Sequence, residues 1–303
     1  MTDLISIFVN NLLPILLISG SGFLLGKFLH IEPRSFGRII FYILNPFLVL
    51  NLLIKNQLSL VGILKTSVFA ICVLLVTSLL TMFIGRLFKL ERPIMAAVLL
   101  TSVFANNGNY GLPLVSFAFG QDALAYASIY FITISLLLNT VGVLIASMGR
   151  MNFKEAALGM LKVPTVYAII IALIVIRTGW VIPAPLDRSI SLLAAGAIPS
   201  MLILLGLELQ NAQWTKNILA LSLSNTMRLL IGPMIGWGLS LLFGMKGPAR
   251  QAGILDAALP TAVMTTILAT EYQLEPSLVT AIVFSSTILS PLTLAPLLFL
   301  LGK

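Results

Sequence analysis

The sequence predicts an all-α polytopic membrane protein of about ten transmembrane helices, and a weak internal similarity predicts that they form two inverted five-helix repeats. Three observations predict the membrane fold. The 303-residue chain is 59% hydrophobic and 9% charged, its mean hydropathy is +1.07, and its apolar runs are as long as that at 60–85. An average soluble protein is about 25% charged, so this chain cannot cover a water-exposed surface. A transmembrane barrel is disfavoured because its strands are short and alternate with polar lumen-facing residues.

Apolar runs separated by charged or Gly/Pro-rich breaks define the spans, because a helix needs about 20 apolar residues to cross a bilayer. The expected spans are 5–26, 36–54, 61–85, 93–119, 124–148, 164–182, 189–210, 216–244, 250–270 and 277–301. The first span has no preceding basic residue and is too long for the core of a cleaved signal peptide. We therefore expect it to be retained.

Basic residues in the short connections favour one orientation, because Lys and Arg are enriched in cytoplasmic loops. Within the first five spans and the connection after them, nine basic residues follow odd-numbered spans and two follow even-numbered spans. We expect a multi-pass protein of the plasma (inner) membrane with both termini outside the cytoplasm. The net charge is +8, but the basic residues form no block, which argues against a nucleic-acid partner.

The two halves of the chain resemble each other weakly. Segment 35–54 aligns with 188–207 at an offset of 153 residues, and junction 121–124 aligns with 275–278 at an offset of 154. A five-span unit crosses the membrane an odd number of times, so its second copy must be inverted, as in many secondary transporters. We expect the first repeat at 1–150 and the second, inverted repeat at 151–303. A chance match between apolar strings is the alternative.

The densest polar cluster inside a span is Asn106-Asn107-Gly108-Asn109-Tyr110-Gly111-Leu112-Pro113 in the fourth span. Three asparagines are costly in hydrocarbon unless they are paired. Pro113 removes a backbone donor, and Gly108 and Gly111 lower helix propensity. We expect the helix to break between about 107 and 113, where protein or a water-filled cavity must satisfy the freed groups. A proline kink packed against neighbouring helices is the alternative.

The ninth span carries the partner feature, Leu255-Asp256-Ala257-Ala258-Leu259-Pro260-Thr261. Pro260 frees the carbonyl of Asp256 four residues earlier, so a carbonyl and a carboxylate share one turn. That pair suits a cation or a proton. Where two unwound helices cross, half-helix ends of both signs meet, with positive ends toward an anion and carbonyl ends toward a cation.

Charged and polar residues elsewhere in the spans are further candidates. Arg228 lies about midway along the eighth span, where it needs an anionic substrate or a structural partner such as Asp256 or Glu208. Glu208 lies near the end of the seventh span, and we expect it at the membrane interface. Asn45 and Thr261 could line the central cavity, although the proline after Asn45 explains much of that pattern.

For each class of enzyme that acts within a membrane, the sequence lacks a required catalytic residue. The only histidine, His30, lies in a loop, out of reach of a serine in a span, and Asp256 has no second carboxylate for an aspartyl protease. The chain contains no P-loop string that would bind a nucleotide. The single Cys72 excludes an intrachain disulfide and a cysteine metal site. We expect no catalytic residue, no metal site and no cofactor other than a coupling proton or sodium ion.

Three strings, at 106–113, 258–263 and 284–301, together resemble the auxin efflux carrier family of bacterial permeases and plant carriers. The resemblance covers essentially the whole chain. It implies a bile-acid symporter-like fold with crossing discontinuous helices four and nine, and transport of organic anions. The crossover residues that it implies are Asn106, Gly108, Asn109, Gly111, Pro113 and Pro260. The chain lacks the long hydrophilic loop that plant carriers have after span five, so we expect a small carboxylate as substrate and not auxin.

We expect a secondary active transporter of small organic anions, mono- or dicarboxylates, that works by alternating access around a midplane site. A proton carrier is expected if Asp256 is neutral, and a sodium ligand or structural counter-ion if it is ionised. An anion-selective channel or uncoupled uniporter is the alternative, because broken helices also build pores. The expected partners are the substrate, the lipid bilayer and, in one alternative, a second copy of the chain. The expected substrate-binding residues are Asn106, Asn107, Asn109, Arg228, Asn45 and Thr261, with Gly108, Gly111, Pro113 and Pro260 at the crossover and Asp256 for ion coupling.

Overall fold

A computed structural model describes residues 2–29, 31–56, 58–147, 163–210 and 215–302. Helices account for nearly all of these residues, and no strand occurs among them. The one β-type contact in the described ranges is an isolated antiparallel bridge between Ala105 and Thr261. The all-α polytopic membrane fold that the hydropathy predicts is therefore confirmed.

The first half of the chain forms helices that are interrupted by wide π-helical turns, labelled η. Their bounds are α1 (Thr2–Ile7), η1 (Phe8–Leu12), α2 (Leu13–Leu29), α3 (Pro33–Ile39), η2 (Ile40–Leu44), α4 (Asn45–Asn56), α5 (Leu60–Leu87), α6 (Arg92–Val103), η3 (Asn107–Gly111), α7 (Leu112–Leu137), η4 (Leu138–Gly142) and α8 (Val143–Ala146). Gly120 has a left-handed φ of 75° within α7. This residue therefore turns the chain between the end of the fourth expected span and the start of the fifth.

The second half begins, in the described residues, with α10 (Pro164–Thr178) and ends with α16 (Pro276–Leu301). Between them lie α11 (Ala184–Leu209), α12 (Ile218–Thr226), η5 (Met227–Ile231), α13 (Gly232–Leu242), α14 (Gly247–Ala258) and α15 (Met264–Glu271). Seven helices of the described chain are long and apolar enough to cross a membrane, while Arg92–Val103 and Pro164–Thr178 are shorter apolar helices. The ten-span count and the repeat boundary at 150/151 stay predictions, since residues 148–162 lie outside the described ranges.

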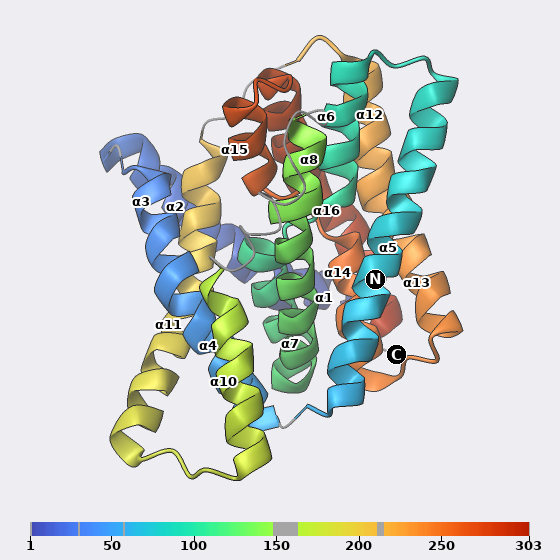
Figure 1. Cartoon of the computed structure of the whole chain (residues 1–303). Coiled ribbons are helices and arrows are strands. Elements are labelled where there is room, and N and C mark those ends of the chain that lie inside the picture. Colours follow the sequence, from blue (N-terminus) through green and yellow to red (C-terminus); the bar gives the residue numbers. More distant parts are fainter. Residues whose placement is uncertain (1, 30, 57, 148–162, 211–214, 303) are drawn as a thin grey trace.

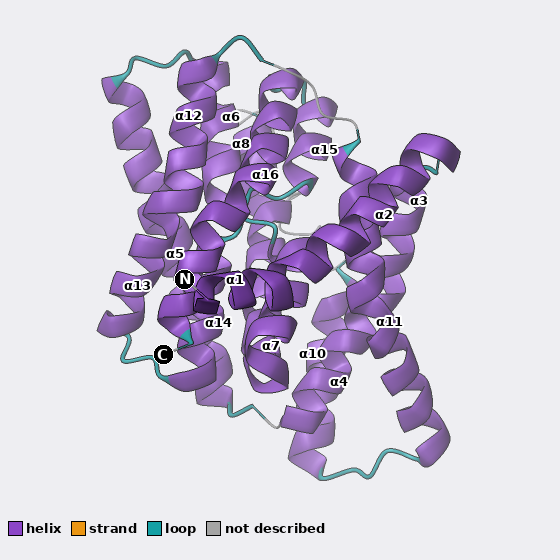
Figure 2. Ribbon diagram, turned by 180° about the vertical axis from the view of Figure 1, so that it is seen from behind, coloured by secondary structure: helices purple, strands orange, loops and turns teal. Residues whose placement is uncertain are grey.

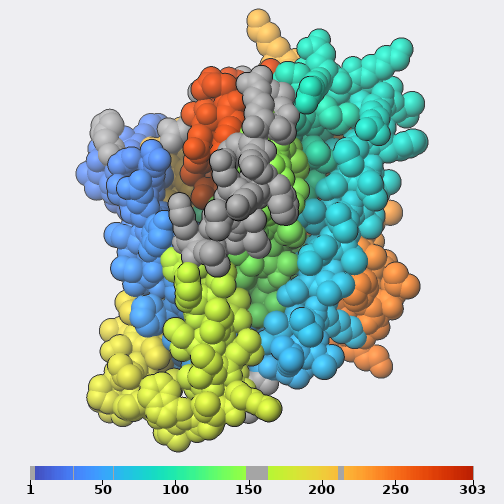
Figure 3. Space-filling model, viewed as in Figure 1, coloured from blue at the N-terminus to red at the C-terminus, as the bar shows by residue number. Residues whose placement is uncertain are grey.

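The helices form two groups that lie side by side (Figures 1 and 2). In the first helix group, α2 packs against α11, and α4 packs against both α10 and α11. The second helix group contains α5, α6, α7 and α12 to α16, with α14 packed against α7 and α13. On the face shown in Figure 3, the blue and yellow-green residues of the first group lie beside the cyan and teal residues of the second. The boundary between the groups runs past η3 and α7, which contact α11 and α4.

Glycines set the closest helix contact within the first helix group. A Cβ at Gly22 would collide with the carbonyl group of Ile203, and one at Gly206 would collide with the carbonyl oxygen of Ser19. The backbones of α2 and α11 therefore touch directly. Small residues at a helix interface allow such a close approach.

The connections between helices alternate between the two ends of the bundle in Figure 1. The α5–α6 connection lies at the upper end, and the α4–α5, α10–α11 and α13–α14 connections lie at the lower end. On the outer surface, α5 exposes more than half of Leu75, Leu79, Phe83 and Leu87. Their spacing of four residues places them on one helix face, as expected for a side that meets lipid.

Candidate functional site

Two broken helical segments cross in the second helix group. The first segment leaves α6 at Val103 and re-enters a helical turn at Asn107, and the second leaves α14 at Ala258 and resumes at Met264. The extended stretches between them pair in antiparallel fashion, because Asn106 N donates to Pro260 O at 2.8 Å and Ala262 N donates to Phe104 O at 2.9 Å. Four half-helix ends therefore meet at one place: the carbonyl ends of α6 and α14 and the amide ends of η3–α7 and α15.

The break in the fourth span lies earlier than the sequence predicts. Its non-helical residues are 104–106, whereas the expected range was about 107–113. Pro113 is instead the second residue of α7 and is buried. The helix has already restarted at Asn107, because the π-helical turn η3 runs directly into α7. A proline inside a helix leaves the carbonyl four residues earlier without its backbone donor, and wide π-helical turns are a common site of such irregularity. Pro113 thus lies beside the irregular turn η3 and not at the break.

The two glycines of η3 make room for neighbouring side chains. A Cβ at Gly108 would lie 2.9 Å from Cε2 of Phe131. A Cβ at Gly111 would collide with Cδ1 of Leu259 and would lie 3.2 Å from Oδ1 of Asp256. Gly111 therefore lets the end of α14 approach η3, a packing role in addition to the lowered helix propensity expected from sequence.

Asp256 and Asn107 are paired across the crossover. Nδ2 of Asn107 donates to Oδ1 of Asp256 at 2.9 Å and to the carbonyl oxygen of Asp256 at 3.1 Å. The carbonyl that Pro260 frees is thus satisfied by an asparagine of the other broken segment. Asp256 is fully buried and Asn107 is 1% exposed. Within the described structure, Oδ2 of Asp256 and Oδ1 of Asn107 have no hydrogen-bond partner.

The other two asparagines have different surroundings. Asn106 precedes the first turn of η3 and is 5% exposed, and its Nδ2 has no hydrogen-bond partner among the described residues. Asn109 is half-buried and donates from Nδ2 to Oε2 of Glu208 on α11 at 3.3 Å. Glu208 was expected at the membrane interface, but it is half-buried and joins the two helix groups through this hydrogen bond.

Arg228 lies on η5, is 2% exposed and points into the crossover. Its Nη1 donates to the carbonyls of Ser102 at 3.0 Å and Val103 at 3.2 Å, at the end of α6. Its Nε donates to Leu259 O at 2.9 Å, and its Nη2 donates to Ala257 O, at the end of α14. All four acceptors are main-chain carbonyls, so among the described residues Arg228 makes no hydrogen bond to the expected carboxylate partners Asp256 and Glu208. Its role in substrate binding stays a prediction.

Thr261 and Asn45 were both expected to line the central cavity, but they lie in different parts of the structure. Thr261 is fully buried at the bridge, and its Oγ1 donates to Thr101 O at 2.9 Å. Asn45 begins α4 in the first helix group and is 5% exposed. Its Oδ1 has no partner in the described part of the chain. The described hydrogen bonds bring Thr261 into the crossover but do not link Asn45 to it.

Hydroxyl groups around the crossover escaped the sequence analysis. Thr101 and Ser224 share a hydrogen bond of 2.8 Å between α6 and α12. Ser286 Oγ accepts from Thr261 N at 3.1 Å, and Ser290 Oγ donates to the hydroxyl of Tyr110 at 3.1 Å. Ser286 and Ser290 are four residues apart on α16 and so share one helix face. That spacing was the signal that could have identified them.

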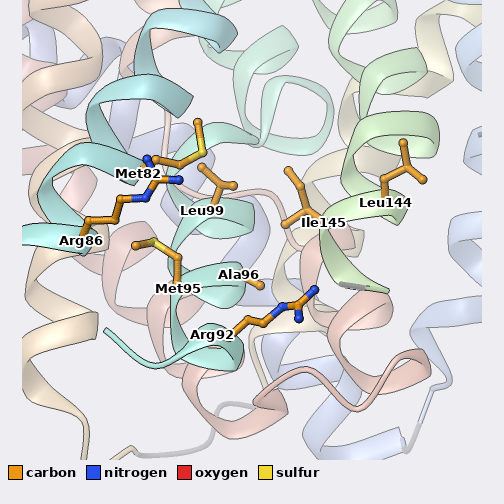
Figure 4. A pocket seen from close by; sticks show the side chains of 8 residues that line it. All are labelled: Met82, Arg86, Arg92, Met95, Ala96, Leu99, Leu144 and Ile145. Carbon is orange, nitrogen blue, oxygen red and sulfur yellow. The ribbon is translucent and has the colours of Figure 1, made fainter. Parts of the chain in front are cut away.

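A hollow of about 250 Å³ lies apart from the crossover, between α5, α6 and α8 (Figure 4). Its lining is mainly apolar, with Met82, Met95 and Leu99 among the lining residues, and includes the side chains of Arg86 and Arg92. None of the crossover side chains lines it. We therefore keep the crossover as the candidate site.

Comparison with known proteins identifies the family. The model of a family described as "Membrane transport protein" matches residues 7–298. The chain belongs to this family. Among the similar proteins of the membrane transport protein family are uncharacterized transporters of two archaea. That of Methanocaldococcus jannaschii is 25% identical over 274 residues, which cover 87% of this chain and 88% of the relative. That of Methanothermobacter thermautotrophicus is 25% identical over 268 residues, which cover 87% of each chain.

Plant members of the membrane transport protein family match a shorter part of the chain. Auxin efflux carrier component 8 of Arabidopsis thaliana is 31% identical over 137 residues, which cover 43% of this chain and 36% of the relative. The resemblance to the auxin efflux carrier family is thereby confirmed. The chain is a multi-pass membrane protein of a transporter family.

Proposed function

We propose that this protein is a secondary carrier of small organic anions, mono- or dicarboxylates, that binds its substrate at the crossover. The observation that carries the proposal is the buried Nδ2 of Asn106, a donor without a partner in the described structure. It lies where η3 begins, so the amide end of a half-helix and a free donor are next to each other. Both favour an anion.

The charge balance at the crossover supports the same proposal. The carbonyl ends of α6 and α14 are occupied by Arg228. At the amide end of η3–α7, the carboxyl group of Asp256 is hydrogen-bonded to the side chain of Asn107, and it adds no charge there when it carries a proton. No carboxylate is hydrogen-bonded to the amide end of α15 among the described contacts. An anionic substrate would complete the pairing of half-helix ends with charges.

The burial of the site supports alternating access as the mechanism. Asn106, Asn107, Arg228, Asp256 and Thr261 are each at most 5% exposed, so a substrate can reach them only after a rearrangement. The boundary between the two helix groups passes beside η3, and the Asn109–Glu208 hydrogen bond crosses it. Rocking of one group against the other would break that contact and open the site to one side at a time.

We infer that Asp256 carries a coupling proton. Oδ2 of Asp256 and Oδ1 of Asn107 are both acceptors without a donor in the described structure. A proton on Oδ2 would turn one of these acceptors into a donor, and the acid and the amide could then satisfy each other. Sodium is the less favoured ion because the unpartnered oxygens of this pair, Oδ2 of Asp256 and Oδ1 of Asn107, are few for a full sodium shell.

A ligand screen followed by a transport assay tests the carrier function. Purified protein is screened by thermal shift with dicarboxylates, keto acids and aromatic acids, because a ligand at 100 times its Kd stabilises by about 2.7 kcal/mol. Uptake of each labelled ligand that binds is then measured in proteoliposomes, with and without unlabelled substrate inside. Faster uptake into preloaded vesicles is expected of a carrier. Flux that neither saturates nor exchanges would instead identify an anion channel.

Imposed gradients test the coupling. Wild type should concentrate the substrate on a proton gradient, and Asp256→Asn should lose this response while still exchanging substrate. Asp122→Asn is the matched control, because Asp122 is an exposed carboxylate at the start of the fifth expected span. Uptake that follows only a sodium gradient, or an Asp256→Asn protein that still concentrates substrate on protons, would contradict the proton role.

A further inference from the structure

Arg228 connects two segments that are far apart in the sequence. Its guanidinium bridges the carbonyls of Ser102 and Val103 to those of Ala257 and Leu259, across sequence separations of 125, 126, 29 and 31 residues. The first two carbonyls end α6 and the other two lie at the end of α14. One side chain of a third element, η5, therefore holds both interrupted helices.

A cluster of carbonyls at helix ends is a cation site by its chemistry. The last carbonyls of a helix have no intrahelical partner and carry the negative end of the helix dipole. In carriers with interrupted helices, such ends and unwound carbonyls coordinate a cation. Here two such ends converge, and the group between them is a guanidinium, which is always charged and weakly hydrated. The cation is thus part of the chain.

The neighbouring sequence is built to admit this side chain. A Cβ at Gly232 would lie 2.5 Å from Ala257 O and 3.4 Å from Nη2 of Arg228. A Cβ at Gly236 would lie 2.7 Å from Cβ of Ala257. Both glycines therefore bring the eighth expected span against the end of α14, as small residues at a helix interface allow. The wide turn η5 directly precedes Gly232 and carries Arg228 toward the four carbonyls.

We propose that Arg228 is a tethered cation, which permanently fills the cation position at the carbonyl ends of the two broken helices. The crossover then needs no sodium ion from solution. Arg228 is a positioning residue in this account, since it sets the angle between the interrupted helices and leaves the amide ends for the substrate. The inference deepens the proposed function. Only its consequence for ion coupling depends on that function.

Thermal unfolding of the purified protein tests the proposal without any substrate. The melting temperature of wild type is measured in sodium, potassium and choline chloride at equal ionic strength, and we expect the three values to agree. Arg228→Ala should lower the melting temperature by about 4 °C or more. Guanidinium at about 10 mM, far below denaturing concentrations, should restore part of that loss in a saturable manner, as should sodium ions.

Matched variants separate this role from a general packing role. Arg250→Ala removes an equally large cation from α14, where Arg250 lies 5.0 Å from the centre of the Trp237 ring, and guanidinium should not restore its stability. Arg228→Lys keeps the charge without the planar fork and should fall between wild type and Arg228→Ala. Urea at the guanidinium concentration should rescue neither variant.

Two outcomes would overturn the proposal. The first is a sodium-specific, saturable rise of the wild-type melting temperature, because the crossover would then take its cation from solution. This measurement uses only the wild-type protein, so it tests the proposal even if no Arg228 variant folds. The second is an Arg228→Ala protein whose stability responds to neither guanidinium nor sodium. Since neither outcome involves transport, failure here is distinguishable from failure of the carrier function.

Discussion

The two broken segments meet at the same place but contribute different chemistry. The fourth-span break contributes side-chain amides, since Asn106 lies in it and Asn107 and Asn109 follow it. The ninth-span break is lined by small and apolar residues and contributes one carboxylate, Asp256, together with backbone carbonyls. Two segments expected to be related by a repeat therefore need not carry the same residues at their interruptions.

This difference teaches what a crossover requires. Both segments need a stretch of extended backbone that can pair with the other, and both have it. The side chains only have to complement each other, as the amide of Asn107 complements the carboxylate of Asp256. The weak sequence similarity of the two halves is consistent with this requirement.

The largest effect is expected where the two segments touch most closely. Gly111→Val places a branched side chain where Leu259 and Asp256 lie, and overpacking of this kind typically costs about 1–3 kcal/mol or more. We expect loss of transport and a strongly lowered melting temperature. Gly238→Ala is the control, because a Cβ there meets nothing within 4 Å. A normally stable Gly111→Val protein would mean that the crossover is looser than described.

Asn106→Ala tests whether the fourth-span segment supplies the anion contact. Its Nδ2 has no partner in the described structure, so its loss breaks no described hydrogen bond from that atom and should affect the melting temperature less than Asn107→Ala does. Substrate uptake should fall by about tenfold or more, the value of one charge-assisted hydrogen bond. Asn139→Ala serves as control, because Asn139 donates to Ser135 O of its own helix. Normal uptake by Asn106→Ala would remove this residue from the site.

Asn107→Ala tests the bond between the two segments. It leaves Oδ1 and the carbonyl of Asp256 without their donor, and an unsatisfied buried group costs about 1–3 kcal/mol. A lowered melting temperature is expected. The double variant Asn107→Ala with Asp256→Ala should cost less than the sum of the single changes, because the pair is lost together. Strict additivity would show that the two residues act independently.

The smallest effect is expected for Pro113→Ala. Since Pro113 lies in a continuous helical stretch that begins at Asn107 and the break lies at 104–106, alanine should keep both the break and the helix. We expect uptake within about twofold of wild type, because a good helix former is tolerated in this turn. Loss of transport in the proteoliposome assay would show that Pro113 shapes the break after all.

The fold class was predictable because it depends on composition and on the length of apolar runs. The approximate places of the two interruptions were predictable as well, since asparagines and prolines are costly in the middle of a span. The exact break in the fourth span was not. A proline inside a span predicts an irregularity near its own position, and that irregularity is the π-helical turn η3. The break itself lies at Ala105, whose bridge to Thr261 has no signature in the sequence.

The partners of the charged residues could not be read from sequence. Arg228 binds main-chain carbonyls, and a carbonyl leaves no signature in the amino-acid sequence. Glu208 meets Asn109 only because α11 packs against η3, a contact between distant parts of the chain. Charge alone indicated that these residues needed partners, but the partners depend on tertiary packing.

The direct contact between α2 and α11 has a mechanical consequence. At Gly22 and Gly206 the two backbones touch with no layer of side chains between them, and interlocked backbones resist the small sliding movements by which packed helices usually shear. These two helices must therefore translate as one rigid body. Where α4 and α11 face α7 and η3, side chains from both helix groups lie between the backbones. Sliding of one group against the other should therefore meet the least resistance along this interface.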